Sequence, residues 1–265
     1  MKIARIFASL LLLIAWGQVS AQGNGKQPDT LFQVSTLDAL LAGDYEGRAS
    51  FREVKRHGDF GLGTFVALDG EMVAVDGVYY QVRVDGVATP VVDQELTPFA
   101  AVTFFDADDT FRVAGETGCT ELHELLQERF PSGDLPYAIK VTGRFTKLTT
   151  RSVPAQEKPY PPLVDALQQQ VAFNLSDVDA TLAGFWLPAF LAGVNVAGFH
   201  FHAITADATT GGHVLDCLAS DVLVEIDQTD ELRVQFSDSN RLHRPLSKHE
   251  EGVPRQGNWP SLSHW

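Results

Sequence analysis

Residues 58–86 read GDFGLGTFVALDGEMVAVDGVYYQVRVDG, and this stretch decides the fold class. Runs of β-branched and aromatic residues are interrupted by Asp-Gly pairs at 69–70, 76–77 and 85–86. Asp-Gly between apolar alternations is among the strongest short-range signals for a β-hairpin turn. The stretch therefore predicts a β-meander that extends from residue 58 to about residue 92.

Strand-like runs dominate the rest of the chain as well, at 99–108, 137–153, 179–207, 213–227 and 231–238. Helical spacing predicts three short helices, within 31–47, 120–130 and 163–175. Ser35 or Thr36 is expected to cap the first helix, which Gly43 ends, and Thr120 is expected to cap the second. The pattern indicates an α+β protein with mostly antiparallel or mixed β-sheets in two closely associated halves.

The Pro-dense stretch 154–163 favours a boundary near the middle of the chain. We expect an N-terminal β-rich domain at 31–150 and a C-terminal β-rich domain at 151–243. The last residues, 244–265, form a tail with weak periodicity, and residues 22–30 form a flexible leader.

The N-terminus is typical of a secretory signal peptide. Lys2 and Arg5 precede an apolar run that is short for a membrane span, and small residues lead up to Ala21. We expect cleavage after Ala21 and a mature protein that is periplasmic or secreted, with an uncleaved anchor as the alternative. Removing the signal lowers the net charge from −14 to near −16, which disfavours nucleic acid and anionic membranes as partners.

The chain contains two cysteines, Cys119 and Cys217. They could pair in an oxidising compartment, but two cysteines do not make a disulfide framework. Cys217 lies in a strand-like run and is expected to be buried. We therefore expect no disulfide bond.

Three histidines lie in one short, largely apolar stretch, GFHFHAITADATTGGHVLD at 198–216. On a strand His200 and His202 project from the same face, and a Gly-containing turn brings His213 back toward them. Three neutral imidazoles with an open fourth position are the usual ligands of a catalytic zinc ion. The spacing predicts a metal site, whereas the isolated histidines at 57, 123, 243 and 249 are interpreted as surface residues.

Several motifs together resemble the alpha-acetolactate decarboxylase family. The histidine stretch is similar to the family's metal site, and the resemblance extends from about residue 31 to residue 237. The other matching motifs are LFQVSTLDALLAGDYEG at 31–47, GDFGLGTFVALDGEMVAVDGVYYQ at 58–81, TPFAAVTFF at 97–105 and TTRSVPAQEKPYPPL at 149–163.

The resemblance implies a homodimeric zinc enzyme that converts 2-acetolactate to acetoin and carbon dioxide through a zinc-chelated enediolate. It implies His200, His202 and His213 as the zinc ligands. It also implies active-site roles for three further residues: Glu71, Arg151 and, from the tail, Glu251 or its neighbour Glu250. One of the glutamates would protonate the enediolate, and Arg151 would bind the substrate carboxylate.

Other interpretations stay open. The histidines also fit a different three-histidine zinc enzyme, such as a hydratase or hydrolase, or a non-catalytic periplasmic metal-binding module. Without the resemblance, Glu71 beside a hairpin turn would be interpreted as a solvated residue and Arg151 as a surface ion-pair partner.

Overall fold

The computed structural model describes residues 29–236. The predicted signal peptide, most of the leader, His243, and the tail with Glu250, Glu251 and His249 therefore lie outside the described residues. Within residues 29–236, no helix is long and apolar enough to cross a membrane.

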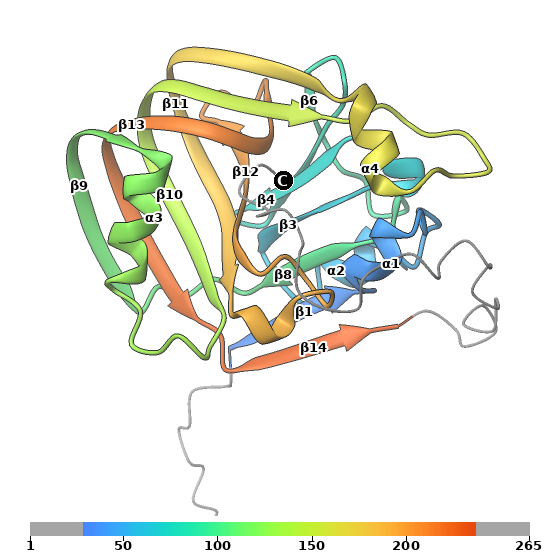
Figure 1. The fold of residues 1–265 in the computed structure, drawn as a ribbon, viewed down its shortest axis with the longest axis horizontal. Coiled ribbons are helices and arrows are strands. Elements are labelled where there is room, and N and C mark those ends of the chain that lie inside the picture. The colour runs from blue at the N-terminus through green and yellow to red at the C-terminus, as the bar shows by residue number, and fades with distance from the viewer. Residues whose placement is uncertain (1–28, 237–265) are drawn as a thin grey trace, which may run out of the picture.

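The larger sheet contains the predicted meander (Figure 1). Its strand order is β14-β1-β8-β3-β4-β5-β6, and all neighbours are antiparallel except β1 and β14. In that order the strands are β14 (Glu231–Gln235), β1 (Thr30–Val34), β8 (Ala100–Thr103), β3 (Phe60–Thr64), β4 (Glu71–Val75), β5 (Val78–Val82) and β6 (Ala88–Pro90). The Asp-Gly pairs at 69–70 and 76–77 directly precede β4 and β5, which confirms the meander.

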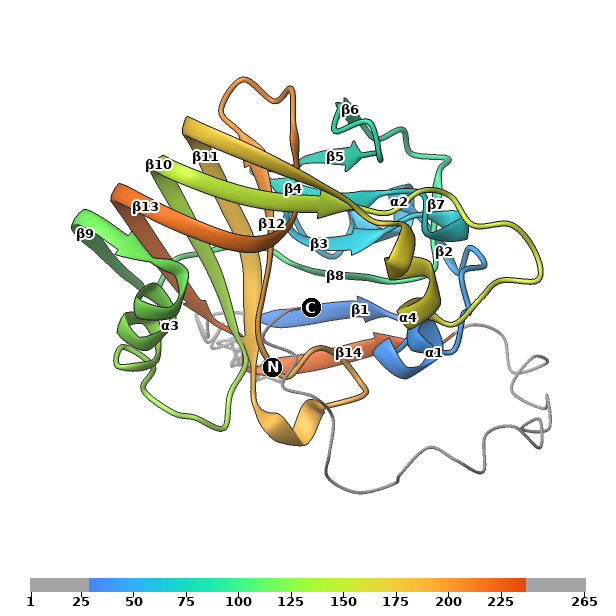
Figure 2. The ribbon, with the colours of Figure 1, turned by 45° about the horizontal axis from the view of Figure 1, so that its top comes forward.

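The second sheet consists of long, curved strands in the order β10-β11-β12-β13-β9 (Figure 2). They are β10 (Tyr137–Ser152), β11 (Val171–Leu187), β12 (Gly198–Thr205), β13 (Gly211–Gln228) and β9 (Asp109–Gly118). Since β10 pairs with both β11 and β13, these strands and β12 close on themselves. Along the chain, the passage from the larger sheet to the second sheet lies between β8 and β9. The domain boundary predicted from the sequence, near residue 150, lies inside β10.

Short elements complete the fold. A two-stranded sheet joins β2 (Ala49–Ser50) to β7 (Leu96–Thr97), and the α-helices are α1 (Leu37–Leu41), α2 (Phe51–Val54), α3 (Cys119–Gln127) and α4 (Leu163–Ala166). The 3₁₀ turns are η1 (Val66–Leu68), η2 (Leu167–Gln169) and η3 (Ala189–Leu191).

The three predicted helices exist but differ in extent. Thr36 caps α1 by accepting a hydrogen bond from the Ala39 amide at 3.2 Å, as predicted. Thr120 does not cap α3, because that helix already begins at Cys119 with Gly118 as its N-cap. The helix expected at 163–175 ends within η2, and β11 starts at Val171 because the following residues pair with the end of β10.

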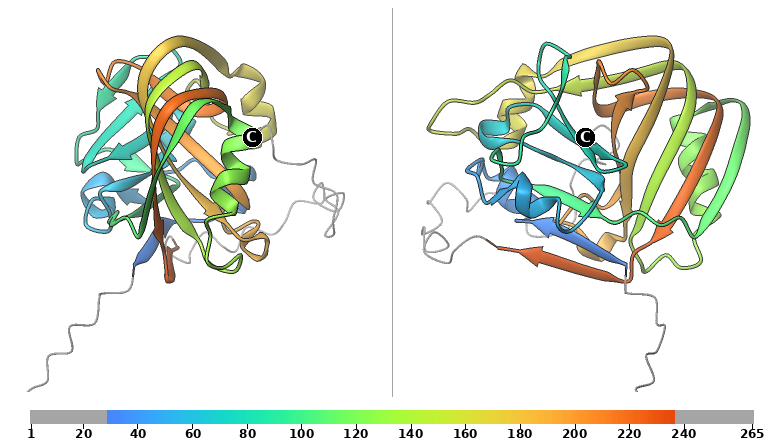
Figure 3. Two further views of the ribbon diagram at one scale, coloured as in Figure 1. Left: turned by 90° about the vertical axis from the view of Figure 1, so that its left-hand side faces the viewer. Right: turned by 180° about the vertical axis from the view of Figure 1, so that it is seen from behind.

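The core is layered. One cluster fills the space between the sheets, with residues such as Leu62 and Val73 from the larger sheet and Phe185 from the smaller one. A second cluster lies between the smaller sheet and α3, which covers the face turned away from the larger sheet (Figure 3, left). Each fully buried large apolar side chain contributes roughly 1.5–3 kcal/mol to the free energy of folding, so these clusters hold the two sheets and α3 together.

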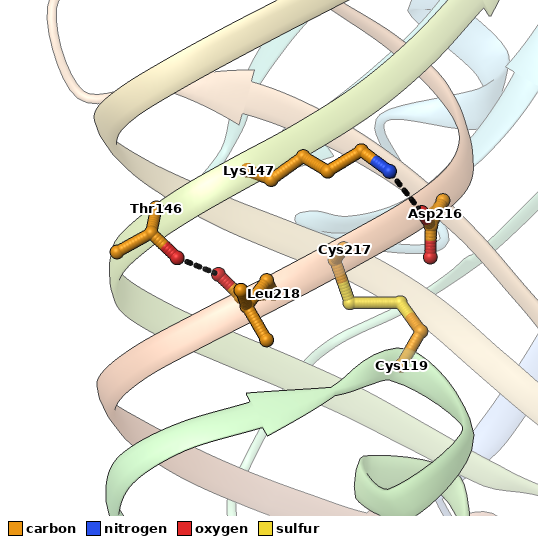
Figure 4. The surroundings of a disulfide bond; sticks show 6 residues. All are labelled: Cys119, Thr146, Lys147, Asp216, Cys217 and Leu218. Carbon is orange, nitrogen blue, oxygen red and sulfur yellow. Dashed lines mark hydrogen bonds and ion pairs between the residues drawn. A yellow bond between two sulfur atoms is a disulfide. The ribbon is translucent and has the colours of Figure 1, made fainter.

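Two expectations from the sequence are wrong. Cys119 and Cys217 form a disulfide bond, which joins the start of α3 to β13 (Figure 4). Spacing could not reveal it, because the folding of β9 and β13 into neighbouring strands brings the cysteines together. His57 and His123 are not free surface residues either, since each imidazole stacks on a phenylalanine ring, Phe32 at 3.9 Å and Phe199 at 4.1 Å respectively.

Candidate metal centre

The three predicted histidines converge. His200 Nε2 lies 3.1 Å from His213 Nδ1, which lies 3.3 Å from His202 Nε2. Tetrahedral zinc with bonds of about 2.0–2.1 Å would separate its nitrogen ligands by about 3.3 Å. The donor set and the spacing therefore fit a metal ion, as the alternation and the turn predict.

Backbone pairing creates this convergence. His200 and His202 share one face of β12, and His202 lies opposite His213 in the register of β12 and β13. Glycine is required at Gly212, which has a φ of +122° and whose added Cβ would lie 2.5 Å from the Arg151 carbonyl oxygen. The Gly-containing turn thus places the third imidazole against the other two.

Hydrogen bonding and burial prepare the imidazoles as ligands. His202 Nδ1 donates to the Met72 carbonyl at 2.7 Å, so its Nε2 carries the lone pair that faces the other rings. His200 Nδ1 is buried and has no hydrogen-bond partner among residues 29–236. Burial, and then the charge of Arg151, lowers the pKa of His200 to about 3; burial also holds the pKa of His202 well below its usual value. Both rings are therefore neutral near pH 7.

A buried ion pair lies beside the histidines. Arg151 Nη1 donates to Glu71 Oε1 at 2.9 Å, and Glu71 Oε2 lies 3.6 Å from His202 Nε2. Each residue of the pair is only 7% exposed. Burial raises the pKa of Glu71, and Arg151 opposes that shift. The interpretations of Glu71 as solvated and of Arg151 as a surface residue, which would hold without the resemblance, are excluded.

Backbone pairing and hydrogen bonds next to Glu71 and Arg151 fix the positions of both residues. Glu71 follows the turn at Gly70, whose amide donates to the Val153 carbonyl at 3.1 Å. Arg151 lies opposite His213 in the register of β10 and β13. The next residue, Ser152, donates through its hydroxyl to the Val82 carbonyl at 2.8 Å. The end of β10 is thereby joined to the larger sheet at the point where β4 begins.

Strained backbone precedes Glu71. Ala67 and Leu68 both have left-handed φ values, 62° and 61°. Residues in such conformations persist only where their surroundings fix them. Ala67 is fixed on both sides, since its amide donates to the Tyr45 carbonyl and its carbonyl accepts from the Gln156 amide. These two hydrogen bonds therefore fix the position of the turn that precedes Glu71.

The structure brings together five of the six predicted site residues: the three histidines, Glu71 and Arg151. Glu251 lies outside the described residues. The sequence did not indicate the Met72 carbonyl as the partner of His202, because every residue has a carbonyl and only the packing of β12 on β4 selects this one.

Comparison with known proteins identifies a family. Residues 31–246 match the profile of the family "Alpha-acetolactate decarboxylase". Alpha-acetolactate decarboxylase of Methanosarcina mazei is 51% identical over 188 residues, which are 71% of this chain and 65% of that relative's length. The Bacillus subtilis protein of the same name is 41% identical over 212 residues, 80% of this chain and 83% of its own length. The crystal structure of alpha-acetolactate decarboxylase from Bacillus subtilis strain 168 has a TM-score of 0.78 at 39% identity and covers 80% of this chain and 90% of its own.

Proposed function

Since the chain belongs to the alpha-acetolactate decarboxylase family, we propose that it converts 2-acetolactate to acetoin and carbon dioxide. The observation that carries the proposal is the buried Glu71–Arg151 pair beside three convergent histidines. A site for binding metal alone would not require a buried arginine and a carboxyl group at the same place.

We propose that His200, His202 and His213 hold a zinc ion. Three neutral ligands leave the dipositive charge of the metal intact. When bound, zinc supplies a Lewis acid that stabilises negative charge developing on the substrate oxygens.

Arg151 is proposed to bind the substrate carboxylate. In a protein with a net charge of −14, an anionic substrate needs a local positive group, and Arg151 supplies one next to the histidines. A guanidinium has five N–H donors, so the bond from Nη1 to Glu71 leaves donors for a second carboxylate. Fixed in this way, the carboxylate would be oriented for loss as carbon dioxide.

Glu71 is proposed to complete the reaction. When the bond to the carboxyl carbon breaks, its electron pair moves toward the ketone oxygen and leaves an enediolate. A proton must then reach the carbon that lost carbon dioxide, which forms acetoin. A carboxyl group whose pKa is raised by burial is suited to hold and donate that proton. Glu251 of the tail is the second candidate for this role.

Export and assembly belong to the same proposal. A disulfide such as Cys119–Cys217 persists in oxidising compartments, which supports a periplasmic or secreted location after removal of residues 1–21. We also propose a homodimer, by analogy with the family. Light scattering of the mature protein tests the dimer.

Acetoin formation from racemic 2-acetolactate tests the activity. Arg151→Met should lower kcat/KM about 10²–10³-fold, by loss of a buried charge that positions the reacting group, while zinc content is unchanged. Arg144→Met is the matched control, because Arg144 lies on the same strand but pairs at the surface with Asp179. Activity of Arg151→Met equal to that of Arg144→Met would refute the role of Arg151. Zinc-loaded wild-type protein that makes no acetoin would refute the function.

A further inference from the structure

The two strands that carry the histidines separate soon after their turn. β12 and β13 pair at only three positions, His202 with His213, Ala203 with Gly212 and Ile204 with Gly211. His200 lies beyond these pairs, where β12 pairs with β11 on its other side. Direct backbone pairing therefore fixes His202 against His213 but leaves His200 without a backbone link to β13.

Helix α3 contacts both β12 and β13 and so connects the two strands where they do not pair directly. Cys119, at its first position, is bonded to Cys217 of β13 (Figure 4). One turn further along the same helix face, the His123 imidazole stacks on Phe199 with ring centroids 4.1 Å apart and planes 13° apart. Phe199 directly precedes His200, so a continuous path runs from β13 through α3 to β12.

The contacts lie on the face opposite the metal centre. Phe199 and Phe201 alternate with the histidines of β12 and therefore point away from them. Phe201 and Cys217 are buried in the cluster that includes Leu122 and Leu126 of α3. The helix thus contacts both strands on the face opposite the one from which the histidine ligands of β12 project.

We propose that α3, anchored by the Cys119–Cys217 disulfide, is a clip that sets the position of His200 relative to His213, with His123 as its positioning residue on β12. The inference rests on the proposed metal site. Displacing the clip would let the His200 end of β12 shift, and the three nitrogens would no longer meet at the spacing a metal requires. His123 acts in this clip by stacking its ring on Phe199. An uncharged phenyl ring at position 123 should therefore fulfil the same role.

The test measures metal affinity and stability on the same full-length mature variants. Co²⁺ is bound in competition with a chelator and followed by its visible absorption, and thermal unfolding is followed in parallel. His123→Ala, and Cys119→Ser combined with Cys217→Ser, should each weaken Co²⁺ binding about tenfold, the lower end of the loss usual for residues that orient metal ligands. His123→Phe should bind Co²⁺ like the wild type. Val54→Ala is the matched control for a loss of core packing, because Val54 of α2 is buried in a separate apolar cluster with residues of the larger sheet such as Phe32 and Met72.

Each outcome decides the proposal. Weaker binding in the clip variants, with normal binding in His123→Phe and Val54→Ala, supports it. Wild-type affinity in His123→Ala overturns it, even if that variant unfolds at a lower temperature. Wild-type affinity in a folded cysteine variant, or an equal loss in Val54→Ala, also overturns it. The His123 pair is decisive even if the cysteine variant does not fold, because both members keep the disulfide. If wild type and His200→Ala bind Co²⁺ equally, the metal site and the clip fail together, whereas the preceding results overturn the clip alone.

Discussion

Replacing Arg151 by methionine should leave Glu71 as an unpaired carboxyl group in the interior. The two side chains form a 2.9 Å contact and are each only 7% exposed, so water screens their interaction little. Breaking a buried pair by removing one partner typically costs 3–5 kcal/mol. We therefore expect Arg151→Met to lower the free energy of unfolding by about 3 kcal/mol near neutral pH, and far less near pH 5.

The sign of the pH dependence follows from the raised pKa of Glu71. Burial already raises it, and loss of Arg151 removes the opposing effect. A carboxyl group whose pKa is higher in the folded state binds protons on folding, so its folded form is favoured at low pH and loses that advantage as pH rises.

A second substitution should restore stability. Glu71→Gln combined with Arg151→Met removes the unpaired charge, so the double variant should be more stable than Arg151→Met near pH 8 and should lack its additional pH dependence. The assay is denaturant unfolding of metal-free protein near pH 8 and pH 5, with Arg144→Met as the surface control. Equal, pH-independent losses in Arg151→Met and in the double variant would show that the pair is not a coupled buried unit.

Three further outcomes are expected. Replacing both cysteines by serine should lower the free energy of unfolding by about 4.7 kcal/mol, because the disulfide closes a loop with a sequence separation of 98 and so limits the chain entropy of the unfolded state. Denaturant unfolding with and without reductant measures this loss, and a loss below about 1 kcal/mol would contradict the prediction. Burial lowers the pKa of His123 to about 4 from 6.5, so its neutral form contributes stability above pH 6.5 that is lost as pH falls through 4. His123→Phe should accordingly lose less stability than wild type across that range, and parallel curves would refute the assignment. Mass spectrometry of exported protein should find a chain that begins at Gln22, and a retained Met1 would exclude cleavage.

Local patterns were sufficient for much of the fold and for the metal ligands. The Asp-Gly turns specify the meander because that dipeptide tolerates the backbone of a tight hairpin, as at Asp76 and Gly77, which both have positive φ. The spacing of His200 and His202 places both on one strand face whatever the tertiary structure.

Features that depend on distant contacts were not accessible in this way. Glu71 directly follows a turn, where glutamate is usually solvated, and it is buried because Arg151, 80 residues later, lies against it. The disulfide and the stacking of His123 likewise depend on how α3 packs on β12 and β13. Val171 begins a strand although helical spacing precedes it, because β10 offers a pairing edge there.

The most direct test of the central claim is acetoin formation by the purified mature protein before chelation, after chelation and after zinc is restored, with metal content determined on the same samples. The proposed function predicts turnover that is lost with the metal and returns at about one zinc per chain, and that is absent in His200→Ala. Acetoin formation that persists in fully metal-free protein would contradict the assignment of His200, His202 and His213 as ligands of a catalytic metal.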